Sequence, residues 1–141
     1  MTFITVLLFM IRLLAPRTDD DIAYRTALAV AIVSVTDDPQ EQRQLAKIAR
    51  FESNYRRDVG DCRVLGGVGE RGAWQILARG AVERAALCVS LEGDARIALA
   101  RIRESVSACR HLPKEARLAI YARGRCSSAE GQRLSKVRYA P

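Results

Sequence analysis

Glu52 is the residue best placed for acid–base chemistry. It follows Leu45, Ile48 and Ala49 at helical spacing, so its carboxyl group projects from the face that these side chains are expected to bury. Removal from water disfavours the charged carboxylate and raises its pKa, which suits a group that donates a proton near neutral pH. We therefore predict that Glu52 is a catalytic acid; the alternative is a solvated carboxylate paired with a nearby arginine.

Three short motifs accompany this glutamate along the chain. They are Phe51-Glu52-Ser53-Asn54-Tyr55, Gly69-Glu70-Arg71-Gly72-Ala73-Trp74-Gln75-Ile76 and Ile120-Tyr121-Ala122-Arg123-Gly124. In order and spacing they resemble the lysozyme-like soluble lytic transglycosylase (SLT) family over about residues 42 to 126. The motifs depart from the family's usual residues in several places, a variation that resembles phage-borne members.

The resemblance implies a role for each matching residue. In that family a glutamate–serine pair closes a helix and the glutamate is the catalytic acid. A glycine and a following glutamine–hydrophobic pair line the sugar cleft, and a later tyrosine closes the site. The residues of this chain at those positions are Glu52, Ser53, Gly72, Gln75, Ile76 and Tyr121.

Two more residues of the glycine-rich segment are candidates for contact with substrate. Trp74, the only tryptophan, is expected either to stack on a sugar or to pack in the core. Glu70 is the best-placed second carboxylate for a hydrolase, and its alternative role is a salt bridge to Arg71 or another arginine. With Glu52 alone, the substrate's own hydroxyl would attack the anomeric carbon and leave an anhydro-sugar.

The function that the resemblance implies is cleavage of the β-1,4 glycan strand of peptidoglycan, by a lytic transglycosylase or muramidase that needs neither cofactor nor metal. The main alternative is a catalytically silent cell-wall-binding or virion structural module with the same fold. A basic helical nucleic-acid binder is less favoured, because it has no reason to place Glu52 on an apolar face. We expect a monomer whose partner is peptidoglycan and not nucleic acid.

Composition and charge fit this expectation without requiring it. The 141 residues are 49% hydrophobic and 28% charged, as in an ordinary globular protein. The 23 basic and 16 acidic side chains give a net charge of +7, which favours a polyanionic partner such as the bacterial cell wall. The basic residues are scattered along the chain and form no block with interleaved aromatics.

The elements that would carry the motifs are mostly helices. Apolar spacing at Ile4, Leu7, Leu8, Ile11 and Leu14 predicts a first helix. Cap signals open further helices at Thr18, Asp38-Pro39 and Ser90, and a short one is expected between Pro113 and Gly124. Residues 59–72 contain five glycines and predict a loop or small hairpin.

We therefore expect a mainly α, lysozyme-like single domain of about five helices. It would comprise N-terminal helices (1–37), a catalytic core (38–126) and a loosely held basic tail (127–141).

The cysteines and the N-terminus bear on localisation. Four cysteines favour two disulfides and an extracytoplasmic or virion-associated protein, although buried free thiols are an alternative. A helix over 91–108 would hold Cys88 and Cys109 roughly 25–30 Å apart, which disfavours that pair and leaves two connectivities open. The apolar run at 2–11 is too short to span a membrane and reads as a core helix more than as a signal peptide.

Overall fold

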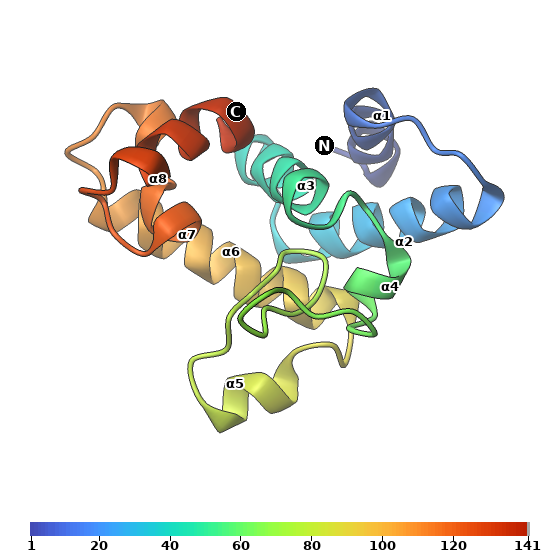
Figure 1. Ribbon diagram of the computed structural model, residues 1–141. Coiled ribbons are helices and arrows are strands. Elements are labelled where there is room, and N and C mark those ends of the chain that lie inside the picture. Colours follow the sequence, from blue (N-terminus) through green and yellow to red (C-terminus); the bar gives the residue numbers. More distant parts are fainter. Residues whose placement is uncertain (141) are drawn as a thin grey trace. The chain divides into compact units, whose positions relative to one another are not determined.

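The computed structural model describes residues 1–140, and this part of the chain is mainly helical (Figure 1). Its elements are α1 (Phe3–Leu13), α2 (Asp19–Val35), α3 (Pro39–Ser53), α4 (Arg57–Gly60), α5 (Ala81–Ala86), α6 (Leu91–Ala108), the 3₁₀ turn η1 (Lys114–Ala116), α7 (Ala119–Arg123), α8 (Ala129–Leu134) and the π-helical turn η2 (Ser135–Tyr139). Within residues 1–140 there is no β-strand, only an isolated antiparallel bridge between Arg71 and Ile76. The predicted mainly α class is confirmed.

The chain forms two compact units. Unit 1 is Met1–Ala98, and unit 2 begins at Leu99, so the boundary falls inside α6. The segments expected from the sequence, 1–37, 38–126 and 127–141, were parts of one domain, and that organisation stays a prediction.

The helix starts predicted at Thr18, Asp38 and Ser90 are confirmed, whereas the single short helix predicted between Pro113 and Gly124 is the 3₁₀ turn η1 followed by α7. The Thr18 hydroxyl accepts a hydrogen bond from the Asp21 N–H at 3.1 Å, and the Asp38 carboxylate accepts one from the Gln40 N–H at 2.7 Å. At α6 the Ser90 hydroxyl accepts from the Gly93 N–H at 3.0 Å. Each side chain satisfies a backbone N–H that the first helical turn leaves without a partner, which fixes where the helix begins.

The core of unit 1 lies where α1, α2 and α3 pack against one another (Figure 1). Its fully buried aliphatic side chains are Val6, Met10, Leu28, Ile32, Leu45 and Ile48. The helix at α1 was predicted, but its predicted inner face is wrong, because Ile4 and Leu8 are 55% and 52% exposed. Since α1 is apolar on nearly every side, its sequence period does not identify the buried face.

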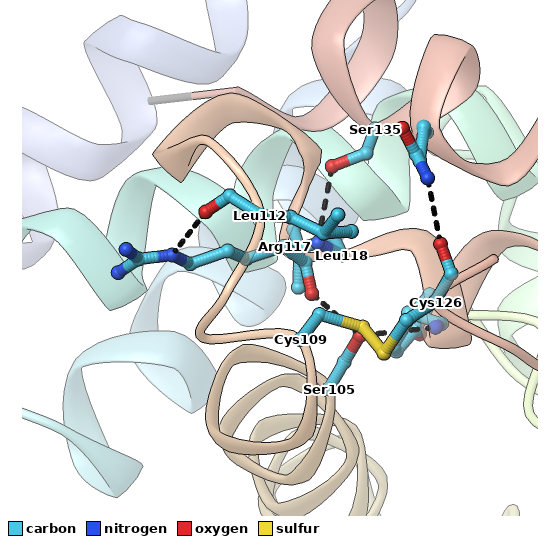
Figure 2. The surroundings of a disulfide bond; sticks show 9 residues. Ser105, Cys109, Leu112, Arg117, Leu118, Cys126 and Ser135 are labelled. Carbon is cyan, nitrogen blue, oxygen red and sulfur yellow. Dashed lines mark hydrogen bonds between the residues drawn. A yellow bond between two sulfur atoms is a disulfide. The ribbon is translucent and has the colours of Figure 1, made fainter. Parts of the chain in front are cut away.

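Unit 2 is built on short elements around one disulfide (Figure 2). The Ser105 hydroxyl donates to the Arg117 carbonyl oxygen at 2.8 Å, and the Ser135 hydroxyl accepts from the Leu118 N–H at 3.1 Å. α8 packs on α7 and η1, and Leu134 and Tyr139 are buried. The expectation of a loosely held tail after residue 127 is therefore wrong for the described residues of that segment.

Each disulfide joins two cysteines of the same unit, with one disulfide in unit 1 and the other in unit 2. Cys62 pairs with Cys88 and Cys109 pairs with Cys126, so none of the cysteines is free. The predicted absence of a Cys88–Cys109 bridge is confirmed, and α6 does separate these two residues. Among the described residues, none of the helices combines the length and apolar character of a transmembrane span.

Candidate functional site

Glu52 lies in the last turn of α3 and is half-buried. The side chains that precede it on the same face, Leu45, Ile48 and Ala49, are fully buried, as their spacing predicted. The helix ends directly after it, because Asn54 and Tyr55 both adopt left-handed backbone conformations, with φ of 54° and 55°. Glu52 therefore stands where an apolar helix face meets a sharp turn.

Ser53 and Tyr55 fix this helix end from inside. The buried Ser53 hydroxyl donates to the Ala49 carbonyl oxygen at 2.8 Å, and the Tyr55 hydroxyl donates to the Ala46 carbonyl oxygen at 3.0 Å. The resemblance implies that Ser53 belongs to the substrate site, but its hydroxyl binds the backbone of the helix that carries it. The burial of its hydroxyl follows from its position at i+4 from Ala49, on the core side of α3.

The glycine-rich segment forms a small closed turn, as expected. The Arg71 and Ile76 backbones exchange N–H···O hydrogen bonds of 3.0 and 2.9 Å, and Gln75 occupies a left-handed conformation (φ 46°) between them. The Gln75 side-chain amide donates to the Gly72 carbonyl oxygen at 3.0 Å. Gln75 is half-buried, whereas Gly72 and Ile76 are buried.

Glu70 and Gln75 converge above Gly66. A β-carbon placed on Gly66 would collide with the Glu70 carboxylate and would lie 2.6 Å from the Gln75 amide oxygen. The Glu70 carboxylate accepts a hydrogen bond from the Val68 N–H at 3.1 Å and forms no ion pair with Arg71. A larger residue at position 66 would require the ends of these two flexible side chains to move.

Trp74 is part of the core. Its side chain is fully buried, and the indole N–H donates to the Leu45 carbonyl oxygen of α3 at 2.9 Å. A buried ring offers no face to a sugar, so the predicted stacking role is wrong and the alternative, core packing, is what the structure has. The same contact holds the glycine-rich segment against the helix that carries Glu52.

Asp94 is a buried carboxyl group that the sequence analysis missed. It is 1% exposed; one oxygen accepts from the Cys88 N–H at 2.8 Å, and the other is buried without a hydrogen-bond partner. A β-carbon on Gly72 would lie 2.7 Å from that second oxygen. Burial raises the pKa of Asp94 to about 6. The available signal was its place three residues after Leu91 and four before Ala98, on the apolar face of α6.

Tyr24 is the second buried polar group of this region with an unsatisfied atom. Its hydroxyl has no hydrogen-bond partner, and burial raises its pKa, with the charges of Asp61 and Asp94 adding to the shift. A β-carbon on Gly60 would lie 2.6 Å from the carbon that bears this hydroxyl. Tyr24 and Asp94 therefore depend on Gly60 and Gly72 for space.

A cleft of about 420 Å³ opens beside the end of α3. Its lining residues are Leu14, Ala15, Arg17, Asp21, Arg25, Arg50, Asn54, Tyr55 and Arg56, and we refer to it as the arginine cleft. Asn54 and Tyr55, the two residues of the left-handed turn that ends α3, line part of this cleft.

Tyr121 lies in α7 and so belongs to unit 2, whereas the other predicted site residues belong to unit 1. It is half-buried, and its ring meets the Tyr139 ring edge-on, with the centroids 6.1 Å apart. Its backbone N–H donates to the Ser105 hydroxyl at 3.3 Å. The ring contact with Tyr139 would account for an aromatic residue at this position.

Comparison with protein-family models, with curated proteins and with solved structures finds no match to this chain. Within residues 1–140, no group of three or more His, Cys, Asp or Glu side chains is arranged to hold a metal ion. Any assignment of function therefore rests on the chain's own residues, above all on the half-buried Glu52 at the end of α3.

Proposed function

We propose that this protein cleaves the β-1,4 glycan strand of peptidoglycan, with Glu52 as the single catalytic acid and base. The observation that carries the proposal is the place of Glu52, half-buried at the end of an apolar helix face and directly before a sharp turn. Such a position excludes part of the solvent from the carboxyl group and leaves the rest of it exposed, as proton donation to a substrate requires. The resemblance to the SLT family supports the same role.

The reaction would begin with transfer of the Glu52 proton to the glycosidic oxygen. As the bond from this oxygen to the anomeric carbon breaks, positive charge develops on the sugar ring. A hydroxyl of the same sugar then attacks the anomeric carbon, its proton returns to Glu52, and the product is an anhydro-sugar. No second carboxylate is required for this route, which is why we favour a lytic transglycosylase over a muramidase.

Glu70 is the residue that would make the hydrolytic route possible. Its carboxylate lies beside the Gln75 amide and is half-buried in the glycine-rich segment. In hydrolysis, a carboxylate either activates water or attacks the sugar directly. A Glu70→Gln variant that keeps its activity, together with products that carry anhydro ends, is the result expected of a lytic transglycosylase.

A second candidate function is a silent module that binds the cell wall or forms part of a virion. The observation that favours it is the burial of Ser53 and Trp74, which withdraws two of the residues that the resemblance implies for substrate contact. For either function we propose an extracytoplasmic or virion-associated location, which the two disulfides support. The net charge of +7 suits the anionic cell wall in both cases.

The deciding experiment compares the wild type with Glu52→Gln on purified peptidoglycan sacculi. The amide keeps the size of the side chain but has no acidic proton, so release of soluble fragments should fall by about 10²-fold or more. Glu92→Gln, at an exposed position of α6, is the matched control and should retain full activity. Mass spectrometry of the fragments, with the reaction run in ¹⁸O-water, separates anhydro ends from hydrolysed ends.

Wild-type protein that binds sacculi without releasing fragments would favour the silent module. Equal activity in the wild type and Glu52→Gln would remove the central claim. Circular dichroism of each variant excludes loss of the fold as the cause of lost activity.

A further inference from the structure

The arginine cleft holds more positive charge than its own acidic side chains neutralise. Four arginines and one aspartate line it, which gives the lining a net charge of +3. Arg56 is satisfied from outside the lining, because its guanidinium pairs with the Asp58 carboxylate at 2.5 Å. Arg17, Arg25 and Arg50 remain, and they share the cleft with Asp21 alone.

Arg25 is the innermost of these cations and is 2% exposed. Its two terminal nitrogens donate to the carbonyl oxygens of Leu14 and Ala15, and its guanidinium lies 5.1 Å from the centre of the Tyr55 ring. The Nε–H donor of the same guanidinium is buried and has no hydrogen-bond partner. An unsatisfied donor on a buried charge is unfavourable unless a ligand or water completes it.

Arg50 and Arg17 add positive charge to the cleft that no acidic side chain there neutralises, apart from Asp21. Arg50 donates to the Leu13 carbonyl oxygen and to the Asn54 side chain, so no carboxylate neutralises it there. Its charge also acts on Arg25, where burial is the main cause of a pKa below the usual range and Arg50 contributes in the same direction. The exposed guanidinium of Arg17 makes no ion pair with a described acidic side chain, although its backbone N–H donates to Asp21 at 2.8 Å.

Capping of α1 explains only part of this arrangement. Arg25 and Arg50 bind the carbonyl oxygens of Leu13, Leu14 and Ala15, as basic side chains commonly do at a helix C-terminus. That role uses neither Arg17 nor the buried Nε–H of Arg25, and it does not require an open cleft. The surplus charge and the free volume point to an anionic ligand.

We propose that the arginine cleft is a binding site for a phosphate group carried by a small ligand of about the size of a sugar phosphate. Guanidinium groups match phosphate oxygens with paired N–H donors, and the net charge of +2 that remains once Arg56 pairs with Asp58 favours a dianion over a monoanionic carboxylate. A cleft of about 420 Å³ exceeds one phosphate and lies within the range typical of small-molecule sites. This site does not depend on glycan cleavage by Glu52.

The test is isothermal titration calorimetry of the full-length protein with glucose 6-phosphate and with inorganic phosphate, at low and high salt. We expect saturable binding of both, weakened by salt, and no binding of glucose. Acetate should bind more weakly than phosphate. Tighter binding of acetate than of phosphate would overturn the phosphate assignment.

Variants locate the site. Arg17→Gln should weaken the binding of glucose 6-phosphate by about threefold to fivefold, as for an exposed charge, and Arg50→Gln by at least about tenfold. Arg12→Gln is the matched control, because Arg12 is exposed at the end of α1 and does not line the cleft. Equal losses in Arg12→Gln and Arg17→Gln would show general attraction to a basic surface and would overturn the proposal.

Since Arg25 and Arg50 both bind carbonyl oxygens at the end of α1, the exposed Arg17→Gln keeps the test independent of folding, and Arg25→Lys is compared once its circular dichroism matches that of the wild type. Lysine retains the charge of Arg25 but loses the guanidinium fork, so phosphate should bind at least about tenfold more weakly. Unaltered phosphate affinity in both variants would exclude this cleft as the site.

Discussion

The buried carboxyl group of Asp94 should make the stability of this protein fall as pH rises. Its pKa is about 6 in the folded state, against an ordinary value of 3.8, because burial disfavours the charged form. Between these two values the folded protein binds more protons than the unfolded chain, so the free energy of unfolding decreases with pH. The decrease begins near pH 4 and is complete once pH passes 6. At about 1.4 kcal/mol per pKa unit, it amounts to about 3 kcal/mol.

Asp94→Asn isolates this contribution. The amide keeps an oxygen that can accept from the Cys88 N–H, but it does not titrate. We expect the wild type and the variant to be similarly stable near pH 4, and the variant to be more stable by up to about 3 kcal/mol at pH 7.5.

The assay is urea unfolding followed by circular dichroism at half-unit pH steps, and the quantity compared is the difference between the two proteins at each pH. Other titrating groups cancel in that difference. A difference between wild type and Asp94→Asn that stays constant from pH 4 to 7.5 would refute the argument from burial.

Two further outcomes test the packing of each unit. Gly60→Ala should destabilise the protein by about 1–3 kcal/mol, because its β-carbon would overlap the Tyr24 side chain. Tyr24→Phe in the same chain should recover part of this loss. If urea unfolding shows no recovery, the Tyr24 hydroxyl is not the obstacle. Replacement of Cys109 and Cys126 together by alanine should lower the free energy of unfolding by about 3 kcal/mol, since the bridge closes a loop of 17 residues in the unfolded chain; an unchanged urea midpoint would contradict this.

Local backbone rules made part of the fold predictable. Thr18, Asp38 and Ser90 marked helix starts because each cap involves residues only two or three positions away. The buried face beneath Glu52 was predictable for the same reason, since one helical period defines it. The impossible Cys88–Cys109 bridge followed from the length of a single helix.

Features that depend on distant partners were not predictable. The buried Trp74 donates its indole N–H to a carbonyl oxygen 29 residues earlier in the chain, and no local sequence pattern predicts that contact. The burial of Asp94 likewise depends on Gly72 and Cys88, which come from the preceding loops. The tail was misjudged because its few apolar residues, Leu134 and Tyr139, are buried by partners that their spacing does not reveal.

The disulfide between Cys62 and Cys88 keeps the protein in one piece when the backbone between these two cysteines is cleaved. The two cysteines enclose α5, which contributes no buried residue and carries the exposed Arg84, a site that trypsin can attack. Cleavage there leaves two polypeptides that the disulfide still joins, so the nicked protein migrates as one species until it is reduced. A protease that reaches this segment thus alters connectivity along the backbone without releasing either piece.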